Sequence, residues 1–187
     1  MSLLAYAEWL AATEGSTALR ESLFMYPLVE STHVLFLLLF VGMTVVWDLR
    51  LIGKVLTDIP VTEMADRVLP WVRAGFVVMV VTGVLLVYAI PVRTYQSVWF
   101  RAKVIFLILA FLNIWYFHAK VLPNAATWDR DVKLPWPVRR AGLASIVLWA
   151  LIIVAGRFIA YNWFDCDIQP QPGFVNWFAG CVVPPPQ

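Results

Sequence analysis

Four long apolar stretches dominate this chain of 187 residues. They cover residues 28–49, 71–92, 98–118 and 140–163. Each stretch is about 20 residues long, which lets a helix cross roughly 30 Å of hydrocarbon. Hydrophobic residues make up 61% of the chain and charged residues only 14%, whereas soluble domains are about 25% charged. The sequence therefore predicts an all-α integral membrane protein with a bundle of four transmembrane helices.

The two ends of the chain flank this bundle. Residues 3–12 show helical apolar spacing with Glu8 on the opposite side, and the segment is too short to span a bilayer. This pattern predicts an N-terminal amphipathic helix on the membrane surface. We therefore expect a surface helix and lead-in over 1–27, a transmembrane domain over 28–163, and a tail over 164–187.

The distribution of basic residues predicts the orientation. Nine of the fourteen lie between the first and second spans or between the third and fourth, when the first residues of the second and fourth spans are included. They are Arg50, Lys54, Arg67, Arg73, Lys120, Arg130, Lys133, Arg139 and Arg140. The positive-inside rule places these two loops in the cytoplasm, so both termini are expected in the periplasm. The net charge of +2 predicts no nucleic-acid partner.

The chain contains two cysteines, Cys166 and Cys181, and both follow the fourth span. An oxidising compartment favours a disulfide between them, closing a loop of about 16 residues and stabilising the fold by roughly 3 kcal/mol. Two unrelated thiols are the alternative. A disulfide agrees with a periplasmic C-terminus.

Ionisable residues from three spans are predicted to lie at one depth near the outer face. Glu30 and His33 are three residues apart, so they share one face of the first span. Arg101 and Lys103 begin the third span, and Arg157 lies about six residues before the end of the fourth. A charge inside a membrane is by default a candidate functional residue.

Each of these residues also has a purely structural interpretation. Arg157 can extend to the outer headgroups, and Arg101 and Lys103 can anchor the interface. An ion pair between Glu30 and Arg157 can fix helix packing. His33 can hydrogen-bond a neighbouring backbone group.

His118, the second histidine, closes the third span at the opposite face. About 25 Å of helix separates His33 from the cytoplasmic end of the first span. The two histidines therefore cannot ligate one haem or one metal ion within a protomer.

The ionisable residues predicted near the outer face include groups that could bind a haem. The His33 imidazole is a suitable axial ligand for haem iron, and basic groups attract haem propionates. These groups are Lys103, Arg101 or Arg157. The second axial position would be filled by Met25, Lys103, a histidine of a partner chain, or nothing.

A second possibility is a metal site on one helix. Glu30 and His33 form a Glu-x-x-His pair, which binds metals in helical bundles. Bundles that hold two metal ions need two such pairs, and the sequence has only this one. A di-iron site is therefore not expected.

Several segments resemble an uncharacterised bacterial family of four-helix inner-membrane proteins. The resemblance lies in WLAATEGSTALRESLFMYPLVESTHVLFLLLFVGMTVVWDLRLIG (9–53), LPWVRAGFVVMVVTG (69–83), FRAKVIFLILAFLNIWYFH (100–118) and GRFIAY (156–161). It implies a multi-pass protein of the bacterial inner membrane and no assigned activity.

More distantly, the layout is similar to copper-resistance D-type membrane domains and to haem-associated four-helix protoporphyrinogen oxidases. In those oxidases a histidine near the start of the first helix and a lysine at the start of the third are functional. His33 and Lys103 stand at the corresponding places. The similarity implies a haem or tetrapyrrole site.

The expected function is a membrane redox or cofactor-binding protein that holds b-type haem near the periplasmic face. His33 would be the ligand, Arg157 and Lys103 would bind propionates, and Glu30 would orient the ligand or couple it to protons. The alternative is a non-catalytic accessory or anchor subunit of a larger membrane protein complex, without a cofactor. The expected partners are the lipid bilayer and either further copies of this chain in a homo-oligomer or the other subunits of a membrane complex. A third hypothesis is the handling of copper or another small solute.

Overall fold

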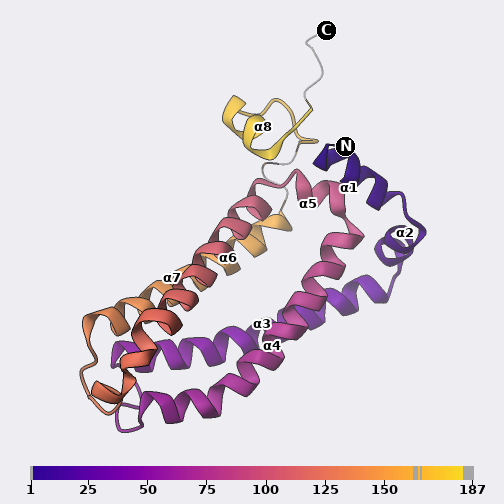
Figure 1. Ribbon diagram of the computed structural model, residues 1–187. Helices are drawn as coiled ribbons and strands as arrows, with labels where there is room; N and C mark the ends of the chain where they lie inside the picture. Colours follow the sequence, from indigo (N-terminus) through magenta and orange to yellow (C-terminus); the bar gives the residue numbers. More distant parts are fainter. Residues whose placement is uncertain (1, 162–163, 165, 183–187) are drawn as a thin grey trace.

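The computed structural model describes residues 2–161, 164 and 166–182, and this part of the chain is helical and contains no strand (Figure 1). Its elements are α1 (Leu3–Ala11), α2 (Glu14–Glu21), α3 (Met25–Ile52), α4 (Val61–Ala89), α5 (Pro91–Tyr95), α6 (Val98–Tyr116), the π-helical turn η1 (Phe117–Val121), the 3-10 segment η2 (Leu122–Thr127), α7 (Trp136–Ile159) and α8 (Gly173–Ala179).

The structure confirms the four long apolar helices that the sequence predicts. Four segments are long and apolar enough to cross a membrane, with mean hydropathy of 1.8 to 2.2. They are α3, α4, α7 and the continuous run Val98–Thr127. Many large apolar side chains on these helices point outward, as expected for a bundle whose solvent is lipid.

The second span is longer than its apolar run indicates. It begins at Val61 rather than at residue 71, and Pro70 lies inside it. The extra turns bury Val61, Met64 and Val68, which lie on one face of the helix. Val61 packs in a cluster with Trp128 and Leu134 of the neighbouring loop. Packing therefore extends the helix into a region that hydropathy alone leaves out.

The long helices form a curved row in which α3 packs between α4 and α7, and α6 packs on the far side of α7. Figure 1 shows α3 beside α4 and α6 beside α7. The helices α4 and α6 make little direct contact. We call the end that carries α1, α2, α5 and α8 the terminal end. The end with the loops 53–60 and 128–135 is the loop end.

Two apolar clusters hold the row together. The middle cluster packs the Phe40 ring edge-on against Trp149, with 4.7 Å between ring centroids. It also contains Val41, Ala110 and Ile152. The cluster at the loop end consists of Leu51, Val61, Phe117, Val121, Trp128, Leu134, Val138 and Ala141. The middle cluster separates the polar groups of the two ends.

Tyr88 ties the N-terminal helices to the end of α4. Its hydroxyl lies 3.0 Å from the Thr13 hydroxyl, and the Ser16 hydroxyl donates to the Tyr88 carbonyl at 2.7 Å. Position 15, which lies between Thr13 and Ser16, requires glycine, because a Cβ there would lie 2.4 Å from the Tyr88 hydroxyl. The helix α1 occupies nearly all of the predicted 3–12 segment.

The C-terminal tail folds back over the terminal end. The predicted disulfide between Cys166 and Cys181 is confirmed, and it closes a loop that contains α8. The last two residues of the predicted fourth span and the chain beyond Val182 lie outside the described residues.

Candidate functional site

His33 lies between α3 and α4 near the terminal end, and one hydrogen bond determines its orientation. Its Nδ1 lies 2.8 Å from the Thr82 hydroxyl. That hydroxyl donates its own proton to the Val78 carbonyl at 2.7 Å. Thr82 must therefore accept a proton from His33, so Nδ1 carries the hydrogen. In the neutral imidazole, Nε2 then keeps its lone pair.

Two glycines face His33 and Lys103. A Cβ on Gly83 of α4 would lie 3.4 Å from His33 Cε1, and a Cβ on Gly156 of α7 would lie 3.3 Å from the Lys103 amine. Lys103 comes from α6 and is close enough to His33 to interact with it electrostatically. We call His33, Thr82, Gly83, Lys103 and Gly156 the terminal-end site.

The Lys103 amine has no fixed counter-charge in the described part of the chain. The ion pairs there join Arg20 to Glu21 and Arg67 to Glu63. An amine between apolar helices is costly without an anionic or hydrogen-bonding partner. The terminal-end site is therefore suited to an anionic group of a ligand.

Glu30 and Arg157 lie outside the terminal-end site. Glu30 is exposed, and a Glu30–Arg157 pair is not among the ion pairs of the described residues. Arg157 is also exposed and donates to the Tyr161 hydroxyl at 3.0 Å, with its guanidinium 5.0 Å from the centre of the Tyr161 ring. Although Gly156 and Arg157 are neighbours in sequence, only Gly156 faces Lys103.

Arg101 holds the C-terminal tail. Its guanidinium donates to the carbonyls of Phe178 and Ala179, the latter at 2.9 Å, and Nε donates to the Tyr95 carbonyl at 3.2 Å. The same guanidinium lies 4.8 Å from the centre of the Tyr95 ring. These contacts use the Arg101 donors to fasten α8 to the bundle.

His118 lies in η1 at the loop end, where it is exposed and its Nδ1 is 3.0 Å from the Ile114 carbonyl. The two histidines are therefore at opposite ends of the bundle. Among the described residues, no three histidine, cysteine or acidic side chains come together in a way that could hold a metal ion.

Sequence reasoning missed a second polar site at the loop end. Asp48 on α3 is only 4% exposed, and its Oδ2 has no hydrogen-bond partner. Ser145 on α7 is close enough to hydrogen-bond the carboxylate. The sequence contained a sign of this site, because Asp48 is a charged residue inside the first apolar span, just as Arg157 is in the fourth.

Asp48 lines a cavity of about 130 Å³, which we call the loop-end cavity. Its wall comes from α3, α4, α6, η1 and α7 and is mostly apolar or aromatic. The lining residues are Phe40, Thr44, Trp47, Asp48, Leu51, Leu69, Val72, Asn113, Ile114, Phe117, His118, Ala141, Ser145 and Trp149.

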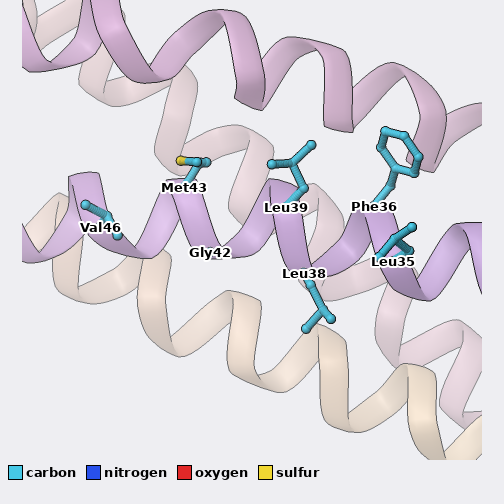
Figure 2. A pocket seen from close by; sticks show the side chains of 7 residues that line it. All are labelled: Leu35, Phe36, Leu38, Leu39, Gly42, Met43 and Val46. Carbon is cyan, nitrogen blue, oxygen red and sulfur yellow. The ribbon is translucent and has the colours of Figure 1, made fainter.

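A larger apolar hollow lies on the outer surface of α3. Figure 2 shows its seven lining residues, which all belong to α3 and include Gly42. None of them is charged or carries a polar group, so the hollow offers nothing to orient a cofactor. It is typical of a helix face that contacts lipid tails.

Comparison with known proteins identifies a family. No curated protein and no solved structure matches the chain. Residues 23–162 match the model of a family of unknown function (DUF6644). The matched range is more than half of the chain, and it contains the four long helices and the whole terminal-end site. The chain therefore belongs to the DUF6644 family.

Proposed function

We propose that this protein is a membrane redox or cofactor-binding protein that holds a b-type haem at its terminal end. The observation that carries the proposal is the hydrogen bond from His33 to Thr82. Because Nδ1–H is donated to Thr82, Nε2 is the nitrogen left to ligate iron. Metal-bound histidines almost always have their second nitrogen held in this way.

The other members of the terminal-end site suit a haem as well. Lys103 supplies a positive charge for a propionate, and its amine makes no ion pair with the described residues. Gly83 and Gly156 present backbone without a side chain to these two groups. When bound, the haem would supply one-electron chemistry at its iron, while His33 binds it and Thr82 orients His33.

The proposal includes an orientation in the bacterial inner membrane. Basic residues lie in the two loops of the loop end and on the helix ends beside them, which supports a cytoplasmic position for that end. They are Lys54, Arg130 and Lys133 in the loops and Arg50, Arg139 and Arg140 on the helix ends. The disulfide supports an oxidising compartment for the tail. We therefore propose that both termini are periplasmic and that α1, with Tyr6 and Trp9 exposed, lies on the membrane surface.

The absorption spectrum of the purified protein tests the haem directly. We expect a Soret band and about one iron atom per chain. Replacing His33 by Ala is expected to remove both, because the iron loses its proposed ligand. His118→Ala is the matched control, since His118 is exposed at the other end and should leave the spectrum unchanged.

Two results would contradict the haem proposal. One is wild-type protein that contains neither haem nor iron after expression with haem precursors supplied. The other is a His33→Ala variant that folds and retains the full Soret band.

Removing the orienting hydroxyl is expected to weaken haem binding. Thr82→Val keeps the shape of the side chain but leaves His33 Nδ1 without an acceptor, and loss of such a partner typically costs about 10–100-fold in affinity. Titration of haem into the apoprotein measures the effect. Thr82→Ser retains the hydroxyl and should bind like the wild type. Equal affinity of the Val and Ser variants would show that this hydrogen bond does not support the ligand.

A role as an accessory subunit is the second candidate function. It is favoured by the tail, where Arg101 and the disulfide hold α8 so that Phe174 and Trp177 are 69% and 76% exposed. Such a fixed aromatic surface suits docking to a membrane partner. Co-purification of one stoichiometric partner with both the wild type and His33→Ala would support this role over the haem function.

A further inference from the structure

The loop-end cavity has the position and size of a small-molecule site. It lies among α3, α4, α6 and α7, and it reaches the surface beside the exposed residues Ile114 and His118. Because α4 and α6 barely touch, their seam is the side on which it can open. A volume of about 130 Å³ is close to that of engineered cavities of roughly 150 Å³ that take up benzene.

The cavity contains one buried carboxyl group without a paired cation. Asp48 takes part in none of the ion pairs of the described residues, and its Oδ2 has no hydrogen bond. Arg50, two residues further on, directs its guanidinium to the carbonyls of Ile59 and Asp131 instead. A buried carboxylate is costly unless a cation or proton neutralises it. The site therefore calls for a positively charged ligand or a proton.

Two other polar side chains in the cavity, Thr44 and Asn113, indicate which kind of cation it could bind. The Thr44 hydroxyl donates to the Phe40 carbonyl at 2.8 Å, and the Asn113 amide donates to the Ala141 carbonyl at 3.0 Å. Thr44 Oγ1 and Asn113 Oδ1 are therefore left as acceptors, and the Asn113 amide keeps one further N–H donor. Together with Asp48 Oδ2 they provide three acceptors, as many as the N–H donors of a primary ammonium group. Ser145 also lines the cavity, beside the Asp48 carboxylate.

The walls suit the organic part of such a ligand. Phe40, Trp47, Phe117 and Trp149 line the cavity with aromatic rings, which attract cations and tolerate methylene groups. Trp47 also brings one unpaired N–H, at Nε1. Hard metal ions require about six or more oxygen ligands, and the mostly apolar wall does not provide them.

We propose that the loop-end cavity binds a small primary ammonium compound, with Asp48 as its counter-charge and Thr44 and Asn113 as hydrogen-bond acceptors. The site is independent of the proposed haem function, because the middle apolar cluster separates it from the terminal-end site.

The test compares ligands of similar size on the full-length protein in detergent, at constant ionic strength. The probes are n-butylammonium, the neutral 1-butanol, and tetramethylammonium, which is a cation without N–H donors. Thermal unfolding and calorimetry should show saturable binding of n-butylammonium. Its affinity should exceed that of either control compound by roughly tenfold or more, as expected for hydrogen bonds between charged groups.

A pair of variants locates the site. Asp48→Asn removes the charge and is expected to weaken n-butylammonium binding by roughly 10–100-fold. Asp66→Asn removes an exposed carboxylate from α4 and should bind like the wild type. If Asp48→Asn does not fold, the selectivity among the three ligands on the wild type still decides the question.

Three results would overturn the proposal. Absence of saturable n-butylammonium binding would mean that Asp48 is neutralised by a proton alone. Equal binding of n-butylammonium and 1-butanol would reduce the cavity to an apolar void. Full affinity in a folded Asp48→Asn variant would place the ligand elsewhere.

Discussion

Replacing Arg50 by Ala is expected to lower the free energy of unfolding by about 2–4 kcal/mol, because a buried hydrogen-bonded link between two loops is lost. Arg50 is 0% exposed although it belongs to α3. Its Nε donates to the Ile59 carbonyl at 2.9 Å and its Nη2 to the Asp131 carbonyl at 3.5 Å. One side chain thus joins the loop after α3 to the loop before α7.

Thermal unfolding in detergent measures this loss, which corresponds to a fall in Tm of roughly 2–4 °C per kcal/mol for a chain of this size. Arg130→Ala is the matched control, because Arg130 is an exposed arginine of the same loop end. Arg50→Lys keeps the charge but not the planar fork, so we expect only partial recovery. An Arg50→Ala variant as stable as the wild type would show that the link contributes nothing.

Gly142→Ala is expected to destabilise the protein by about 1–3 kcal/mol, since the added methyl group overfills a tight helix crossing. A Cβ at Gly142 would lie 2.9 Å from the Asp48 carbonyl and 3.0 Å from Leu51 Cβ. The first of these neighbours is backbone, which cannot rotate away. The variant must therefore separate α7 from α3 and disturb the approach of Ser145 to Asp48.

The matched variant, Gly42→Ala, is expected to change stability in the opposite direction. Gly42 lies mid-helix in the open hollow of α3 (Figure 2), and nothing is within 4 Å of the position of a Cβ. Alanine is favoured over glycine inside a helix by about 0.8–1.0 kcal/mol. Comparing the unfolding of the two variants in one detergent separates crowding from helix propensity. Equal shifts would mean that the α3–α7 crossing is not tightly packed.

The sequence predicted the helices well because the length and polarity of a span are local properties. Four apolar runs of sufficient length are enough to predict four spans. The start of α4 at Val61 could not be predicted in this way. Residues 61–70 include Glu63, Arg67 and Pro70, and their helix buries Val61 in the cluster at the loop end and Val68 on the same face.

For the candidate site, the sequence predicts how far along the bundle each side chain lies, but not the direction in which it points around its helix. Glu30, His33, Lys103 and Arg157 were expected in one layer, since depth follows from position along each helix. Direction around a helix turns by about 100° per residue, and it depends on which neighbours pack where. In the fold, His33 and Lys103 approach one another beside Gly83 and Gly156, while Glu30 and Arg157 are exposed.

The loop-end cavity could not be predicted from one segment, because its three acceptors come from α3 and α6, and α7 completes its wall. Of the residues that supply these acceptors, only Asp48 could have been singled out from the sequence, because it is a charged residue inside an apolar span. Only the fold shows that the Thr44 hydroxyl and one N–H of the Asn113 amide are donated to backbone carbonyls.

By itself, the sequence determined that the chain is helical and suited to a membrane, and it predicted the disulfide correctly. These properties follow from composition and from the order of residues along each segment. The tertiary structure decided which polar side chains meet. That outcome depends on close helix approach at small residues such as Gly75 and Gly142, where a Cβ would lie 3.0 Å from Phe40 Cβ and 2.9 Å from the Asp48 carbonyl, respectively. Such contacts join segments far apart in the chain, so no local pattern encodes them.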